Sequence, residues 1–147
     1  MQISAPGNSR GFTLIELLVV VAIIAMASAG VSFALRDSAS TQLEREAQRL
    51  ASLLESARAQ SRTSGIAVRW FTVDGGFRFE GIQPNSLPEG WLDPGTQTPS
   101  PIALQLGPEP IIGRQEVVLT SRAQPERSVR IATDGLRPFK VATGNEP

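Results

Sequence analysis

The chain contains no cysteine, no histidine and no tyrosine. Without cysteine it can form neither disulfides nor thiolate metal sites, and redox arguments leave its compartment open. Without histidine it lacks the usual general base, the commonest zinc ligand and any serine–histidine pair. Enzymatic chemistry would have to rest on carboxylates and arginines alone. We therefore expect no catalytic residues, no metal and no cofactor, in a protein that is not an enzyme.

An excess of charge of either sign is also missing, because 14 basic and 14 acidic residues give a formal net charge of zero. No overall basic field favours nucleic acid as a partner. The stretch from Arg114 to Lys140 is locally basic and could serve a polyanion such as DNA. Arg130, however, alternates with Val129 and Ile131, so in a strand its side chain would point to the opposite face, which is the ordinary pattern of a solvated strand face. Nucleic acid is therefore not an expected partner.

A long apolar run extends from Phe12 to Leu35, and Glu16 is its only charged residue. At 1.5 Å per residue it makes a helix of roughly 36 Å, enough to cross a bilayer core of about 30 Å. A secretory signal peptide fits less well, because its apolar region spans only about 7 to 15 residues. We predict a hydrophilic leader at 1–11 and a transmembrane helix at 12–35. A carboxylate in such a span costs about 2.5 to 3.5 kcal/mol, so Glu16 either reaches back to the interface or has a function.

The residues around Glu16 form a known pattern. Gly11-Phe12-Thr13-Leu14-Ile15-Glu16 resembles the processing signal of type IV pilins and of type II secretion pseudopilins. The resemblance implies that a prepilin peptidase cuts between Gly11 and Phe12 and that the new amino-terminal Phe12 is N-methylated. It also implies that Glu16 guides subunit assembly.

The segment 36–64 is predicted to be an amphipathic helix, because its apolar residues step by three and four. Gly65 supplies its stop, and no break separates it from the apolar helix before it. A coiled coil is the alternative, since the stripe has heptad spacing, although strands follow at once. The stripe consists of Leu43, Ala47, Leu50, Leu54 and Ala57.

After Gly65 the apolar pattern changes to a period of two. Two such runs flank Asp74-Gly75, which predicts a β-hairpin with one apolar side and one polar side. The polar side should hold an ion pair and a cation–π contact. A turn at Gly75-Gly76 would keep the same two faces and lose only the direct opposition of residues. With Asp74-Gly75 as the turn, the opposite pairs are Trp70 with Phe79, Thr72 with Phe77, Arg69 with Glu80 and Phe71 with Arg78.

Residues 83–114 are rich in proline, which removes ladder donors and disfavours helix. We predict a long loop with at most a short strand near Ile102 to Leu106, serving partner contact or simply disordered. Strands resume at 116–120, 128–133 and 136–141, with Asp134-Gly135 as another hairpin turn. Residues 65–147 would then form one antiparallel β domain.

Three aspartates could be taken for calcium ligands, since calcium prefers carboxylates and carbonyls. Their spacing matches no calcium-loop motif, and aspartate before glycine is typical of turns. We interpret Asp74, Asp93 and Asp134 as turn residues.

The order of elements resembles the minor pseudopilins of the H type in type II secretion, the GspH/FimT family. Less specific features that support this resemblance are residues 48–60, the strand that begins at Gly65, and Asp134-Gly135. The resemblance implies an α+β, type IV pilin-like fold, with a long N-terminal helix packed on antiparallel sheets or a small β-sandwich. Its function would be structural, at or near the tip of a periplasmic pseudopilus that helps export folded proteins across the outer membrane.

The same resemblance implies partners and a location. The partners would be other minor and major pseudopilins, the prepilin peptidase and the inner-membrane assembly platform, with the secretin or exported proteins as further candidates. The helix at 12–35 would be a single-pass anchor in the inner membrane, with the C-terminal domain in the periplasm. The main alternative is a FimT- or FimU-like minor pilin of a type IV pilus, for pilus assembly or DNA uptake. Such pilins often have a cysteine pair, so its absence here favours secretion.

Overall fold

The computed structural model describes residues 12–142, apart from the side chains of residues 29–39. The predicted leader at 1–11, including Gly11, lies outside the described residues, as do residues 143–147. The chain divides into two compact units, Met1–Leu35 and Arg36–Pro147.

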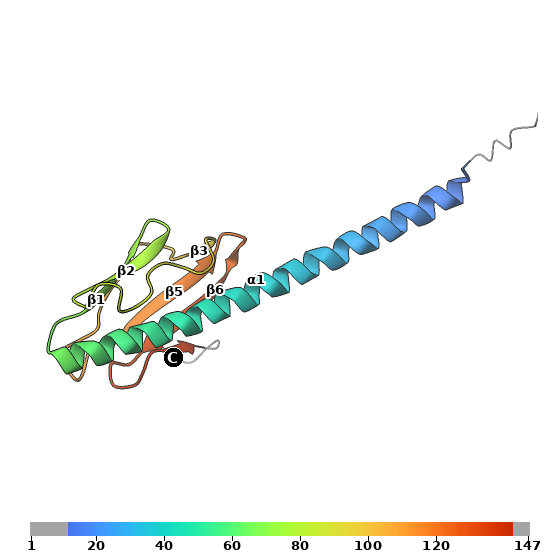
Figure 1. Cartoon of the computed structure of the whole chain (residues 1–147). Helices are drawn as coiled ribbons and strands as arrows, with labels where there is room; N and C mark the ends of the chain where they lie inside the picture. The colour runs from blue at the N-terminus through green and yellow to red at the C-terminus, as the bar shows by residue number, and fades with distance from the viewer. Residues whose placement is uncertain (1–11, 143–147) are drawn as a thin grey trace, which may run out of the picture. The chain divides into compact units, whose positions relative to one another are not determined.

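Helix α1, Leu14–Ser64, contributes to both units (Figure 1). In the first unit every residue from Phe12 to Ser28 is exposed. Within the described part of the chain, no helix has both the length and the apolarity needed to cross a membrane. The transmembrane helix predicted at 12–35 is therefore not confirmed.

In the second unit, α1 buries one face. Leu50, Leu54 and Ala57 are fully buried, and Leu43 is nearly so. The helix ends at Ser64, where Gly65 takes a φ of +70° and donates its N–H to the carbonyl of Ser61 at 2.9 Å. Glycine suits this position because a Cβ would strain the left-handed conformation.

The strands form two antiparallel sheets. The first has three strands in the order β2-β1-β4: β1 (Arg69–Val73), β2 (Gly76–Glu80) and β4 (Ala103–Gln105). The second has four strands in the order β3-β5-β6-β7: β3 (Thr96–Gln97), β5 (Gln115–Ser121), β6 (Gln124–Thr133) and β7 (Lys140–Ala142). The predicted class, α+β with antiparallel sheets and an N-terminal helix, is confirmed. Figure 1 shows both sheets beside the second half of α1.

One hydrophobic cluster joins the helix to both sheets. Leu50 and Leu54 of α1 share it with Trp70 of the first sheet and with Leu119 and Ile131 of the second. The sheets, rather than a second helix, therefore cover the apolar stripe of α1. The coiled-coil alternative is wrong for this reason.

The register of the β1–β2 hairpin is confirmed at all four predicted pairs. Trp70, Phe77 and Phe79 are buried on the apolar side. The polar side differs from the prediction, because no ion pair links Arg69 to Glu80 among the described residues. The guanidinium of Arg69 lies 5.6 Å from the ring centre of Phe71, so the cation–π partner is Arg69 and not Arg78. Arg69 and Phe71 share a face of one strand, which brings them together.

The structure differs from three predictions about the segments after residue 83. The segment 83–114 contains the short strand expected near Ile102, as β4, and also β3, which pairs with β5. Strand β7 begins only at Lys140 instead of Leu136. Pro138 has no N–H to donate, and the N–H of Phe139 is bonded to Glu55 of the helix at 2.9 Å, so neither joins the ladder. Asp134-Gly135 is therefore part of a longer connection and not a two-residue hairpin turn.

The proline-rich segment is anchored to the helix by a buried carboxylate. Glu46, only 2% exposed, accepts the N–H of Leu92 at 3.0 Å and pairs with Arg49 at 2.7 Å. Arg49 in turn donates to the carbonyl of Gly90 at 3.2 Å. The segment was expected either to contact a partner or to be disordered. Around residues 90–92 it is ordered, so disorder is wrong there.

Candidate functional site

The predicted processing and assembly residues lie at the start of α1. Thr13 immediately precedes the helix, and its hydroxyl accepts the N–H of Glu16 at 3.3 Å. The same hydroxyl donates to the Glu16 carboxylate at 3.5 Å, and the carbonyl of Thr13 accepts the N–H of Leu17 at 3.2 Å. The Thr13 side chain thus caps a free N–H of the first turn, as in one half of a capping box, while the Glu16 side chain bonds the Thr13 hydroxyl.

The geometry places Glu16 in the first turn of the helix, where the helix dipole favours a negative charge by about 0.3 to 1 kcal/mol. Phe12, four residues earlier, is 76% exposed. The sequence analysis did not single out Thr13. The sequence does contain a signal for this residue, since a threonine three residues before a glutamate and ahead of an apolar run is typical of a helix start.

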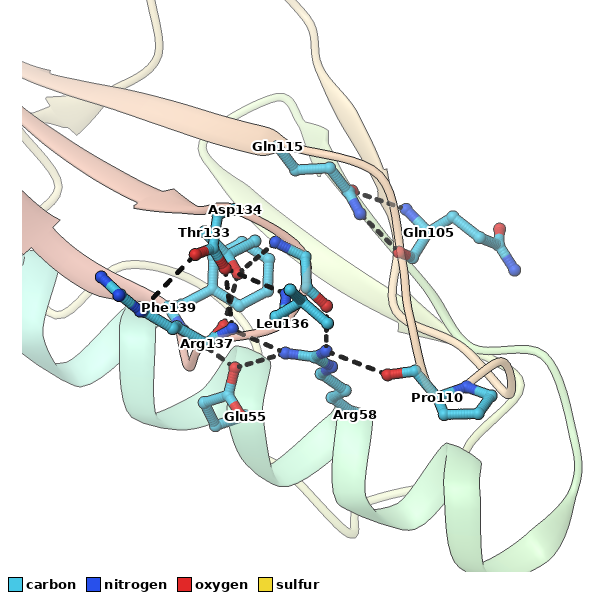
Figure 2. Close-up of polar contacts among 11 residues, drawn as sticks. Glu55, Arg58, Gln105, Pro110, Gln115, Thr133, Asp134, Leu136, Arg137 and Phe139 are labelled. Atoms are coloured by element: carbon cyan, nitrogen blue, oxygen red, sulfur yellow. Dashed lines mark hydrogen bonds and ion pairs between the residues drawn. The ribbon is translucent and has the colours of Figure 1, made fainter. Parts of the chain in front are cut away.

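A second group of polar residues, centred on the buried Arg58, lies where α1 meets two loops of the C-terminal domain (Figure 2). Arg58 is 1% exposed and donates to the carbonyl of Gly135 at 2.6 Å, with longer bonds to those of Pro110 and Arg137. Its guanidinium also lies 3.6 Å from the carboxylate of Glu55. Arg58 thereby joins one helix turn to both loops. The apolar stripe predicted for the helix does not include Arg58, and an isolated arginine gives no signal in the sequence of the carbonyls that surround it.

The turn after β6 is organised by Asp134. Its carboxylate accepts the N–H of Arg137 at 2.7 Å and that of Leu136 at 2.9 Å. These backbone hydrogen bonds, from Arg137 above all, hold the pKa of Asp134 below its ordinary value of 3.8. Gly135 has a φ of +95°, and a Cβ there would lie 1.8 Å from the carbonyl oxygen of Ile112. The turn therefore requires glycine both for its conformation and for its close contact with the neighbouring loop.

A pair of glutamines joins the two sheets, as Figure 2 shows. The side-chain amide of Gln115 accepts the backbone N–H of Gln105 at 3.1 Å and donates to its carbonyl at 2.8 Å. The amide thus occupies the outer edge of β4 as a neighbouring strand would. An exposed strand edge is a site of unwanted pairing, and this contact blocks part of it.

The aspartates considered as calcium ligands take part in turns. Asp93 accepts the N–H of Gly95 at 3.1 Å, and Asp134 makes the turn described above. Asp74 lies in the tight turn between β1 and β2. Among residues 12–142, no three acidic side chains come together as metal ligands.

The predicted basic stretch forms a hollow on the outer face of the four-stranded sheet. Arg114, Arg130, Arg137 and Lys140 line it together with Glu116 and Asp134. The two carboxylates make long, exposed pairs, with Arg130 at 3.9 Å and with Arg137 at 3.7 Å. Ile131 is fully buried while the side chain of Arg130 is 45% exposed, which confirms the predicted split of strand faces.

Comparison with known proteins assigns the amino-terminal segment. A family model described as the prokaryotic N-terminal methylation motif matches residues 6–32. The chain thus has the signal of a type IV pilin-like or pseudopilin-type protein that undergoes prepilin processing. No curated protein and no solved structure matches it.

Proposed function

We propose that this protein is a minor pseudopilin of type II secretion. It would be a structural, non-enzymatic subunit at or near the tip of the periplasmic pseudopilus, helping to export folded proteins across the outer membrane. A prepilin peptidase would remove residues 1–11, and Phe12 would become the N-methylated amino terminus. Residues 12–35 would anchor the subunit in the inner membrane. The methylation motif at residues 6–32 is the observation that carries the proposal.

The exposed apolar side chains of the first unit support this role. Large apolar side chains from Phe12 to Met26 are exposed along this segment, and Glu16 is its only charged residue, so the helix there is apolar on most of its surface. Such a helix is normally buried, either in a membrane or among other helices. A subunit that moves from the inner membrane into a filament of packed helices would satisfy both conditions in turn.

The position of Glu16 suits a registry device between subunits. Cleavage creates a positive amine at Phe12, at the helix end where the dipole is also positive. Among the described residues, the Glu16 carboxylate accepts a bond from the exposed hydroxyl of Thr13 at 3.5 Å, a long contact that a stronger partner could replace. Among packed helices that exclude water, an unpaired carboxylate becomes costly. Pairing with the amine of a neighbouring subunit would then favour one axial stagger over all others.

The basic hollow favours one alternative, a FimT- or FimU-like minor pilin that takes up DNA. Arg114 and Lys140 have no ion-pair partner in the described part of the chain, so the hollow presents uncompensated positive charge. The affinity for DNA would fall steeply as the salt concentration rises, with a slope set by the number of phosphates that the protein contacts. Salt-dependent DNA binding that is lost in Arg114→Gln and Lys140→Gln would support uptake, and pilus genes beside this gene would agree with it.

Mass spectrometry of the mature protein tests the processing step. The proposal predicts loss of residues 1–11 and an N-methylated Phe12. An intact Met1, or cleavage beyond Ala29, would remove the pilin-like interpretation, because the apolar helix would then lack its processed end.

The assembly step is tested by substituting Glu16. Glu16→Leu should enter the membrane and be cleaved normally, yet fail to crosslink to sibling pseudopilins or to support secretion. Glu16→Asp, shorter by one methylene, should be intermediate. Glu44→Leu is the matched control, because Glu44 is an exposed glutamate of the same helix outside the amino-terminal motif. Normal assembly of Glu16→Leu would show that this carboxylate is dispensable.

A further inference from the structure

We propose that the C-terminal domain has a binding site for a neutral saccharide, in the groove between the β1–β2 hairpin and residues 96–101. One or two sugar rings would rest on Trp91 and bond to Asp74, Gln97 and Arg122. The groove encloses about 280 Å³, at the small end of the range of roughly 300 to 1,000 Å³ for ligand pockets. The inference concerns this domain alone and does not depend on the secretion role.

The walls of this hairpin groove are held by contacts behind it. The ring of Trp91 packs edge-on against buried Phe77, with the ring centres 4.7 Å apart. Gly76 approaches Gly90 so closely that an added Cβ would lie 3.1 Å from its Cα. On the other side, the N–H of Arg122 is bonded to the carbonyl of Gly95 at 2.9 Å. A groove with fixed walls loses little conformational entropy when a ligand binds.

Polar groups with unused hydrogen-bonding capacity converge on the groove. Nε of Arg122 donates to the side-chain oxygen of Gln97 at 3.1 Å, which leaves the terminal guanidinium nitrogens and the Gln97 amide nitrogen available. Within the described residues, the carboxylate of Asp74 and the indole N–H of Trp91 have no partner. The indole N–H of Trp91 is also not buried, unlike that of Trp70.

The combination of these groups selects the ligand class. The positive charge of Arg122 is balanced by the negative charge of Asp74, so the groove favours neither an anion nor a cation. It offers several donors, one strong acceptor and the hydroxyls of Thr98 and Ser100. A sugar ring matches this set, because each hydroxyl both donates and accepts while the ring carbons supply an apolar face for an indole.

A bound peptide strand is less favoured in the same place. Strand β1 is paired on both of its edges, by β2 and by β4, and β3 is a sheet-edge strand of only two residues. The free edge of β3 is therefore short, which disfavours extension of that sheet by a peptide backbone. The lining is mainly polar, so it also lacks the apolar anchors that centre a protein interface.

Saturation-transfer NMR of the full chain tests the proposal, in lauryldimethylamine oxide micelles because this detergent has no sugar head group. The probes are cellobiose, maltose and N,N′-diacetylchitobiose, with inorganic phosphate and a Gly-Ser octapeptide as competitors. At least one disaccharide should bind saturably, with a Kd of about 1 mM, as befits a small groove. Neither competitor should displace it.

The variants identify the groove as the site. Asp74→Asn, Arg122→Gln and Trp91→Phe should each weaken binding about tenfold, the loss of roughly one hydrogen bond to a charged or buried group. Arg127→Gln is the matched control, because Arg127 is an exposed arginine outside the groove. Asp74 and Arg122 are exposed, so their variants decide the result even if Trp91→Phe folds poorly. Binding of none of the three disaccharides, displacement by either competitor, or wild-type affinity in both exposed variants would overturn the proposal.

Discussion

Arg58 shows how a single buried charge can hold several segments together. Its guanidinium donates to three backbone carbonyls from two loops, and only Nε has no partner within the described residues. Of these acceptors, the buried Gly135 makes the shortest bond, and losing a buried hydrogen-bond partner costs about 1 to 3 kcal/mol. The burial of the charge is therefore offset by the acceptors around it and by Glu55.

Replacing Arg58 by methionine, which is similar in length and uncharged, should lower the free energy of unfolding by about 3 to 5 kcal/mol. Arg62→Met is the control, since Arg62 is exposed on the same helix and should change stability by less than about 0.5 kcal/mol. Urea unfolding followed by the fluorescence of Trp70 and Trp91 measures both. Equal stabilities of the two variants would show that the guanidinium contacts contribute nothing net.

Asp134 should give the domain a dependence on acid. Its pKa is lowered in the folded chain by the N–H groups of Arg137 and Leu136. The unfolded chain therefore binds a proton more readily at this residue. The stabilisation is complete above the unfolded pKa, near 3.8, and is lost as the pH falls through the lower folded pKa.

The difference in melting temperature between wild type and Asp134→Asn should accordingly shrink as the pH is lowered from about 7 to about 3, because only the wild type loses this contribution. Asp74→Asn, which removes the same charge from the exposed tight turn between β1 and β2, is the matched control for the change in net charge alone. A pH profile of Asp134→Asn parallel to that of the wild type would contradict the assignment.

Among the elements, the second half of α1 is central because both sheets pack on it. Leu50 has no exposed surface and belongs to the cluster shared by the helix and the two sheets. Leu50→Ala should therefore cost about 2 to 5 kcal/mol of stability, through lost burial and the cavity left behind. Leu92→Ala removes the same atoms from a side chain that is 70% exposed and should cost much less. If Leu50→Asp left the melting temperature unchanged, the helix would not pack on the sheets.

The strands differ in how far their sequence predicted them. In the β1–β2 hairpin, the alternation of apolar side chains specified the two faces, and the turn at Asp74-Gly75, one of two turns open from the sequence, gives all four predicted pairs. The connection from β6 to β7 has a similar Asp-Gly pair, yet it forms a longer turn. The difference comes from Glu55, which lies far away in the sequence and takes the N–H of Phe139.

At the scale of the whole molecule, the second unit contains the hydrophobic cluster and both sheets. A fragment that begins at Arg36 should therefore fold without the first unit and remain monomeric, since the apolar surface of residues 12–28 is removed. Size-exclusion chromatography with light scattering and a thermal melt measure these two properties. An unfolded fragment, or one that associates, would show that residues before Arg36 are needed to complete the domain.

The sequence by itself determined the amino-terminal methylation motif and the start of the helix, because both depend on a short contiguous pattern of residues. Residues 11–16 contain that pattern, and their contacts at Thr13 and Glu16 are local. It also determined the amphipathic helix and the first hairpin, whose periodicities follow from backbone geometry.

Only the tertiary structure decided the features made by residues distant in the chain. Arg58 meets carbonyls 52 to 79 residues further along, and Glu46 meets Leu92 at a separation of 46. Strand β3 exists because β5 is beside it, and the hairpin groove exists because Trp91 and Arg122 are brought to the same hairpin. A hydrogen bond or a packed ring depends on distance in space, which a local sequence pattern does not encode.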